Sequence, residues 1–116
     1  MERYLTLCFA DDGHSVYVAE SVQGGVVGYA SVHWLPYLFL LGPEGYVSEL
    51  FVKTEARGQG VGSQLLDVIK AEAQARGCTR LALLNNRQRE SYQRGFYAKC
   101  GWQERTHMAT FMYSLA

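Results

Sequence analysis

The sequence predicts an α/β fold in which a mixed sheet packs against helices. Two observations carry this prediction. Residues 15–53 hold several strand-like apolar segments separated by turn signals, and residues 60–76 follow with apolar side chains at helical spacing. A chain of 116 residues is long enough for one hydrophobic core, so we expect a single domain over 1–116.

The first half of the chain is predicted to consist mostly of strands. Residues 2–10 are the exception and suggest a short helix or the end of one, because four apolar side chains fall roughly on one face. Strands are expected over 15–20 and 26–34, joined by a glycine hairpin signal at 23–25, and Gly28 permits close packing.

The strand expected over 46–53 has the strongest signal. Strict alternation assigns its residues to two faces, Tyr46, Ser48, Leu50 and Val52 on one and Val47, Glu49, Phe51 and Lys53 on the other. An acidic residue between Val47 and Phe51 is unusual in such a strand, which makes Glu49 a candidate for chemistry.

The second half is predicted to hold the helices. The amphipathic helix over about 60–76 has an i,i+4 pair of Glu72 and Arg76 and stops at Gly77. A short buried strand is expected over 79–84.

A second, weaker helix is expected before the C-terminal tail. It would be capped by Asn85 or Asn86 and run through Lys99, with Gly95 weakening it. The tail over 102–115 suggests one or two further strands.

Composition narrows the class of protein. Hydrophobic residues make up 48% and charged residues 19%, and no apolar run approaches the ~20 residues of a membrane span. We see no signal-peptide pattern, and the three cysteines are isolated, so a cytoplasmic protein without membrane attachment or a disulfide framework is expected. The three histidines show no metal-ligand spacing, which predicts no metal site.

Charge is balanced overall but unevenly distributed. The net charge is zero, so no nucleic-acid partner is expected. Residues 1–75 carry four basic and nine acidic side chains, whereas residues 76–116 carry seven basic and two acidic ones. The asymmetry is either chance or a basic wall for an anionic cofactor beside an acidic approach for a cationic acceptor.

The turn Arg57-Gly58-Gln59-Gly60-Val61-Gly62-Ser63 carries the most specific chemistry. It opens the amphipathic helix, whose first turn has unpaired N–H groups and a partial positive charge. Glycines let that backbone approach a diphosphate closely. A kinase-type P-loop lysine is absent, and Ser63 stands where a dinucleotide fingerprint needs glycine. The glycines could also merely shape a strand-to-helix turn.

Two linked motifs show a resemblance to a known family. Arg57-x-x-Gly60-x-Gly62 after a strand, and Phe96-Tyr97-Ala98-Lys99-Cys100-Gly101-Trp102 further on, resemble the signatures of the GCN5-related N-acetyltransferases, the GNAT superfamily. The resemblance covers roughly residues 14–115. It implies a mixed, mostly antiparallel sheet, splayed at a central cofactor cleft and flanked by helices.

The resemblance also implies a cosubstrate and its binding residues. Acetyl-CoA would pair its pantetheine arm with the backbone of Leu50, Phe51 and Val52. Its diphosphate would lie on the turn, at Arg57, Gly58, Gln59, Gly60, Val61, Gly62 and Ser63.

The implied reaction is direct transfer of the acetyl group to a primary amine, of a small molecule or a protein, in a ternary complex. Tyr97 is the candidate acid for the departing thiolate, although it could be a core tyrosine. Glu49 is the candidate base, directly or through water, and a partly buried carboxylate would suit this role. It could instead be a structural acceptor or recognise the substrate.

Two departures from the family pattern stand out. Many relatives have asparagine seven residues before the tyrosine, where this chain has Glu90. The first strand and helix of the usual fold are also expected to be missing, because residues 2–10 resemble the end of the second helix. A bare sheet edge would invite pairing, so a homodimer is expected. The alternative function is a non-catalytic acyl-CoA-binding or interaction module derived from the same fold.

Overall fold

The computed structural model describes residues 3–10, as backbone, and residues 12–115, and it divides into two compact units. The first is Met1–Leu84 and the second is Asn85–Ala116, and each is described by itself. A single domain over 1–116 stays a prediction.

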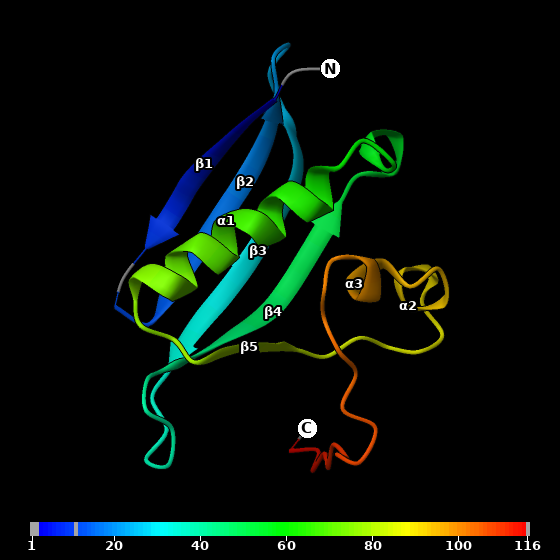
Figure 1. The fold of residues 1–116 in the computed structure, drawn as a ribbon. Helices are drawn as coiled ribbons and strands as arrows, with labels where there is room; N and C mark the ends of the chain where they lie inside the picture. The colour runs from blue at the N-terminus through cyan, green and yellow to red at the C-terminus, as the bar shows by residue number, and fades with distance from the viewer. Residues whose placement is uncertain (1–2, 11, 116) are drawn as a thin grey trace. The chain divides into compact units, whose positions relative to one another are not determined.

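The first unit is a five-stranded sheet with one long helix across it (Figure 1). The strands lie in the order β1 (Arg3–Ala10), β2 (His14–Ser21), β3 (Val26–Leu35), β4 (Glu44–Val52) and β5 (Arg80–Leu83). The first four pair antiparallel, and β5 pairs parallel with β4. The predicted fold class, a mixed and mostly antiparallel sheet flanked by helices, is confirmed.

Strand β1 corrects the prediction for the N-terminus. Arg3–Ala10 is a strand paired along β2, not the end of a helix. Its sequence alternates, with Leu5, Leu7 and Phe9 two apart, and β2 offers its backbone for pairing. Strand β1 therefore lies beside β2, where a missing first strand would have left the sheet edge bare, and the argument for a homodimer from that edge no longer holds. The side chain of Cys8 lies outside the described residues.

Helix α1 (Val61–Ala75) covers one face of the sheet and supplies much of the core. Leu65, Leu66 and Ile69 are fully buried from the helix, and Ala19, Ala30 and Val32 are fully buried from the strands. The helix stops as predicted, because Gly77 has a φ of 76° and the Cys78 N–H reaches back to the Ala73 carbonyl at 2.9 Å.

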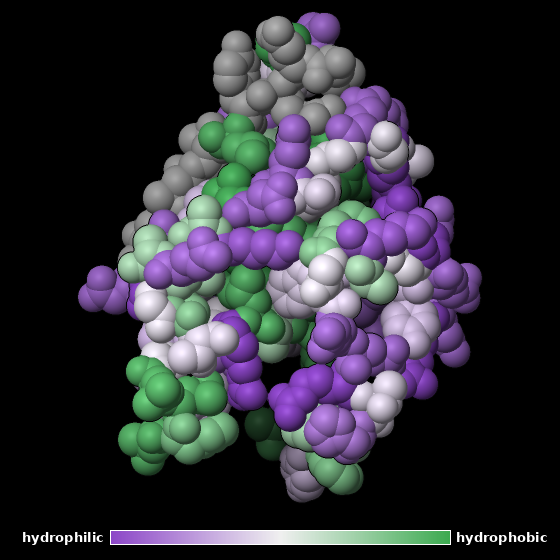
Figure 2. Space-filling model, in the orientation of Figure 1, coloured by the Kyte–Doolittle hydropathy of each residue, from purple (hydrophilic) through white to green (hydrophobic). Residues whose placement is uncertain are grey.

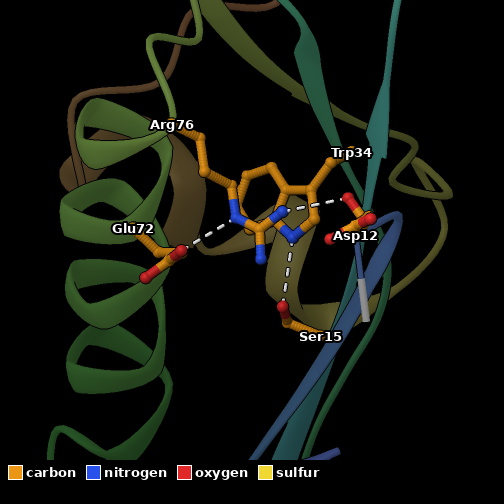
Figure 3. Close-up of polar contacts among 5 residues, drawn as sticks. All are labelled: Asp12, Ser15, Trp34, Glu72 and Arg76. Atoms are coloured by element: carbon orange, nitrogen blue, oxygen red, sulfur yellow. Dashed lines mark hydrogen bonds and ion pairs between the residues drawn. The ribbon is translucent and has the colours of Figure 1, made fainter. Parts of the chain in front are cut away.

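A polar cluster fastens the C-terminal end of α1 to β2 and β3 (Figure 3). The Trp34 indole N–H donates to Ser15 Oγ at 3.1 Å, and the Arg76 guanidinium lies 4.6 Å from the centroid of the same indole. Arg76 also pairs with Glu72 at 2.8 Å and donates to the Asp12 carbonyl at 3.1 Å. Figure 3 shows these groups converging between helix and sheet, so the predicted i,i+4 pair belongs to a larger network.

Gly28 confirms the close packing expected of it. A Cβ at this position would lie 2.9 Å from the Phe51 carbonyl oxygen and 3.1 Å from a Val61 methyl group. The backbone of β3 therefore lies directly under the first residue of α1.

Gly28→Ala is expected to lower the free energy of unfolding by about 1–3 kcal/mol, because β4 and the start of α1 must shift to admit the methyl group. Urea unfolding followed by circular dichroism measures the change. The control is Val26→Ala on the same strand, since Val26 is 43% exposed and should change stability by less than about 0.5 kcal/mol. Equal stability of the two variants would show that the contact at Gly28 is loose.

The loop between β3 and β4 carries an exposed apolar tip. Leu38 and Leu41 are essentially fully exposed and Phe39 is 77% exposed. In Figure 2 apolar side chains gather at the lower left, where Figure 1 draws this loop.

The second unit, Asn85–Ala116, differs from its prediction in two ways. In place of one helix there are two short ones, α2 (Glu90–Gln93) and α3 (Phe96–Lys99), separated at Gly95 with a φ of 69°. That backbone conformation cannot continue a right-handed helix. Neither asparagine caps α2, whose N-cap is Arg89. Asn86 Oδ1 accepts the Gln88 N–H in a turn of its own, and Asn85 Oδ1 accepts the Ser91 hydroxyl.

The tail over 102–115 holds no strand in the part of the chain described. A strand needs a partner for its backbone, and here the Met108 N–H closes a turn onto the Arg105 carbonyl. Phe111, Tyr113 and Leu115 are each about nine-tenths exposed. The apolar sequence of the tail therefore did not suffice to predict strands.

Candidate functional site

The start of α1 presents backbone N–H groups that have no acceptor on a preceding turn. The first N–H to find one is that of Gln64, which donates to the Gly60 carbonyl at 3.0 Å. The amides of Val61, Gly62 and Ser63 precede it and lie at the positive end of a 15-residue helix. Such a group of amides favours an anion.

Glycine conformation keeps this helix start open. Gly60 is the N-cap with a φ of 81° and makes no side-chain cap, and Gly58 has a φ of 79°. A Cβ built at either position meets nothing within 4 Å. The backbone turns sharply into the helix and leaves room beside itself for a ligand.

Arg57 ties the turn to the end of β4. Its Nε donates to the Val52 carbonyl at 3.1 Å, and the short 3-10 helix Thr54–Ala56 buries Ala56 between them. The Lys53 N–H donates to the Val27 carbonyl at 2.8 Å. The turn is therefore held at a fixed place after the strand, with the exposed side chain of Arg57 beside it.

Strand β4 has one edge that is only partly paired. It pairs along its length with β3, but with β5 only from Glu44 to Val47. Beyond that point β4 continues to Val52 while β5 ends at Leu83, and Figure 1 shows the two strands diverging. Within the described chain, Leu50, Phe51 and Val52 have no β-partner on this edge. The structure thus brings together the predicted residues of the strand and of the turn.

A β-bulge at Ser48 corrects the predicted faces of β4. Val47 pairs with Val32, whereas Glu49 pairs with Ser31. Strand β4 therefore has one extra residue, Ser48, between two consecutive partners on β3. Val47 is buried on the side of α1, whereas Glu49 is exposed on the opposite side and accepts a 3.0 Å hydrogen bond from the Tyr29 hydroxyl. The partly buried carboxylate that we expected is therefore an exposed one.

Two histidines share the face of Glu49. His14 and His33 are cross-strand neighbours whose rings stack with centroids 4.2 Å apart, and His14 Nε2 lies 2.6 Å from Ser31 Oγ. Across the residues that the structure describes, no group of three potential metal ligands occurs. No helix among them is long and apolar enough to span a membrane.

Tyr97 lies in the second unit, on α3. Its ring meets that of Phe96 edge-on at 4.9 Å and that of Trp102 at 6.1 Å. Burial raises the pKa of the Tyr97 phenol, and the charge of Arg89 offsets this only in part. The phenol is therefore protonated at neutral pH and remains a proton donor.

A match to a protein-family model shows which family contains this chain. The model of the acetyltransferase (GNAT) domain matches residues 12–104, which is most of the chain and includes the glycine turn and Tyr97. The chain belongs to the GNAT family. The resemblance drawn from the two sequence motifs is confirmed.

Named relatives of this GNAT domain are acetyltransferases. An acetyltransferase of Agrobacterium fabrum is 35% identical over 70% of the chain and 53% of its own length. An aminoglycoside N(6')-acetyltransferase of Stenotrophomonas maltophilia is 29% identical over 96% of the chain and 74% of its own length. A glucosamine 6-phosphate N-acetyltransferase of Oryza sativa is 30% identical over 89% and 61%. The chain thus spans about half to three quarters of the length of these relatives.

Solved structures share the fold. A transcriptional regulator from Bacillus halodurans superposes with a TM-score of 0.78 at 30% identity, over 90% of this chain and 68% of that one. An aminoglycoside acetyltransferase from an uncultured soil sample superposes with a TM-score of 0.79 at 21% identity, over 91% and 68%. These likenesses support the GNAT architecture of the described elements.

Tyr29 is a candidate residue of this GNAT domain that the sequence did not predict. The sequence pattern predicts a strand over 26–34 but not what its tyrosine would meet. The register of β3 with β4, which pairs Tyr29 with Phe51 and brings its hydroxyl to Glu49, has no signature in either strand alone.

Proposed function

We propose that this GNAT domain is an N-acetyltransferase that moves the acetyl group of acetyl-CoA to a primary amine by direct attack. The proposal rests on the backbone N–H groups at the start of α1, which have no acceptor on a preceding turn. They come shortly after Leu50–Val52, the part of β4 that has no β-partner on one edge within the described chain. A diphosphate and an amide-containing arm, linked as they are in coenzyme A, match these two features in order. Membership of the GNAT family supports the same assignment.

The binding residues divide into two sets by the groups they offer. The amides of Gly58 to Ser63 donate to diphosphate oxygens, and Arg57 adds a cation beside them. The backbone of Leu50, Phe51 and Val52 hydrogen-bonds the pantetheine amides as an added strand would. Holding both reactants together supplies a large part of the rate.

Proton transfer is assigned to two side chains. Acetyl-CoA supplies an activated acyl group with a thiolate leaving group. The Glu49 carboxylate, directly or through water, takes a proton from the acceptor ammonium so that its nitrogen can attack. The Tyr97 phenol gives its proton to the departing thiolate. Each transfer contributes about 10²–10⁴-fold when the group is well placed.

A homodimer and a cytoplasmic location also remain predictions. The dimer was first expected because a missing strand would leave a bare sheet edge, and the pairing of β1 with β2 removes that reason. Strand β1 is itself the edge strand of the described sheet, however. An edge strand invites pairing with a second chain in the same way.

Acetyl-CoA is expected to raise the melting temperature of the protein, because a ligand that prefers the native state stabilises it. Gly60→Ala is expected to raise the Kd of acetyl-CoA about 10-fold, since an alanine resists the left-handed conformation at the N-cap and the amides lose their arrangement. Isothermal titration measures the Kd, and thermal melting measures the stabilisation.

Gly77→Ala is the matched control for Gly60→Ala. It lies just after the other end of α1, has a φ of 76°, and has the same open space around a built Cβ. Both variants should lose similar stability, but only Gly60→Ala should lose cofactor affinity. Equal affinities would place the diphosphate elsewhere, and no stabilisation by millimolar acetyl-CoA would reject the proposal. Stabilisation without thiol release over a broad amine panel would favour a non-catalytic acyl-CoA-binding module.

A further inference from the structure

The face of the sheet opposite α1 carries three rows of cross-strand side chains. The rows follow from the strand registers and run across β2, β3 and β4: Val18, Tyr29 and Phe51; Val16, Ser31 and Glu49; His14, His33 and Tyr46. The contacts of Tyr29 with Glu49 and of His14 with Ser31 join neighbouring rows. Apolar, acidic and imidazole groups thus occupy successive levels of one surface.

Two aromatic rings stand beside the exposed carboxylate of Glu49. Tyr29 and Phe51 are directly paired, their ring centroids lie 5.9 Å apart, and the planes are tilted by 36°. Phe51 is 44% exposed although it is a large apolar side chain. The Tyr29 hydroxyl donates to Glu49 Oε1 at 3.0 Å, which fixes the direction of the carboxylate.

Glu49 is not neutralised by a neighbour among the described side chains. None of the ion pairs that they form includes Glu49, and its side chain is exposed. The hydrogen bond to the Tyr29 hydroxyl raises the pKa of that phenol, so Tyr29 stays protonated and keeps donating. One carboxylate oxygen is thereby held, and no ion pair among the described side chains occupies the carboxylate.

We propose that Tyr29, Glu49 and Phe51 form the acceptor subsite of the transferase, and that it binds an ammonium group on an apolar stem. This inference rests on the proposed function, since Glu49 is the base assigned there. The ammonium donates to Glu49, and the rings of Tyr29 and Phe51 lie beside its charge and its first methylene groups. Tyr29 has a second task as a positioning residue, because its hydroxyl aims the carboxylate.

The chemistry of the subsite selects a cation over a neutral polar group. A carboxylate hydrogen-bonds an ammonium more strongly than a hydroxyl, and the faces of aromatic rings attract cations. The surplus of acidic over basic side chains in residues 1–75 adds to the attraction. A merely structural Tyr29–Glu49 pair would stabilise the sheet and show no such selectivity.

The test compares two probes that differ in charge, n-pentylammonium and 1-pentanol, at a pH of about 7, where an alkylamine is protonated. Titrations of the isotopically labelled full chain are followed by the backbone amide NMR shifts of Tyr29, Glu49 and Phe51. We expect the ammonium to bind at least about 5-fold more tightly than the alcohol. Glu49→Gln should abolish that difference.

Tyr29→Phe separates the positioning role from the ring. It keeps the ring and removes the hydroxyl, so ammonium binding should weaken about 3-fold while alcohol binding stays unchanged. Tyr29→Leu should weaken ammonium binding further, because the ring is lost as well. The matched control is Tyr92→Phe, which removes a 2.8 Å hydrogen bond from an exposed tyrosine to Glu104 and should leave both affinities unchanged.

Equal affinity for the two probes, shifts confined to other residues, or no difference between Tyr29→Phe and Tyr92→Phe would overturn the proposal. Thermal melting of each variant checks that it is folded. The readout uses no acetyl-CoA, so it fails independently of the proposed function. Normal stabilisation by acetyl-CoA without ammonium selectivity would reject only this subsite. Ammonium selectivity without stabilisation by acetyl-CoA would retain the cation site and reject the proposed transferase function.

Discussion

Replacing Tyr97 with phenylalanine is expected to lower kcat by about 10²- to 10⁴-fold while leaving the Kd of acetyl-CoA unchanged. The substitution removes the hydroxyl that we propose as the proton donor to the departing thiolate. It keeps the ring that packs edge-on against Phe96 and Trp102, so the structure around α3 should persist. Steady-state kinetics with the most reactive amine of a panel gives kcat, and isothermal titration gives the Kd.

The pH dependence of kcat adds a second readout for Tyr97. Burial raises the pKa of the phenol above its ordinary value of 10.0. The proposed acid is therefore protonated below that pH, and the loss of activity that its ionisation causes should lie above a pH of about 10. Tyr97→Phe should lack this limb.

The control for Tyr97→Phe is Tyr113→Phe, because Tyr113 is 88% exposed on the tail of the same unit. It should match the parent protein in both kcat and Kd. If Tyr97→Phe lost kcat and affinity for acetyl-CoA in equal measure, the role of Tyr97 would be packing. Unchanged turnover would remove it from the mechanism.

Trp34→Ala is expected to lower the free energy of unfolding by about 3–5 kcal/mol. Trp34 is 5% exposed and fills the space between β3 and the end of α1. Its loss leaves a cavity, removes the hydrogen bond from the indole N–H to Ser15 Oγ and removes the surface under the Arg76 guanidinium. Urea unfolding monitored by circular dichroism measures the difference.

Two further variants serve as a control and as a milder substitution for Trp34→Ala. Phe39→Ala also truncates an aromatic side chain, but Phe39 is 77% exposed and the change should be less than about 0.5 kcal/mol. Trp34→Phe serves if the alanine variant does not fold. It loses the hydrogen bond to Ser15 and part of the volume, and it should cost about 1–2 kcal/mol. A loss below about 1 kcal/mol in Trp34→Ala would show that the cluster is not part of the core.

Local signals predicted the sheet core and the long helix. Strands β2, β3 and β4 and helix α1 lie within one or two residues of their expected bounds, because alternation, helical spacing and the glycines at 24, 25 and 77 act within a few residues. The glycine turn before α1 was predictable for the same reason. Its left-handed backbone at Gly58 and Gly60 follows from residue type.

Features that depend on distant partners were not predictable in this way. Residues 3–10 became a strand because β2 offers an edge, and the tail did not because its backbone closes a turn instead. The extra residue at Ser48 puts Val47 and Glu49 on opposite faces of β4, whereas Glu49 and Phe51 share a face as alternation predicted. The contact of Glu49 with Tyr29 depends on the register between β3 and β4. Register across a sheet is a property of two strands, so neither strand alone reveals it.

The central claim is that amides at the start of α1 receive the diphosphate of coenzyme A. A crystal structure of the complex with coenzyme A tests it most directly. We expect diphosphate oxygens about 2.7–3.2 Å from backbone nitrogens between Gly58 and Ser63, with the arm alongside Leu50 to Val52. A diphosphate bound elsewhere, with that helix start covered by the protein's own side chains, would contradict the account.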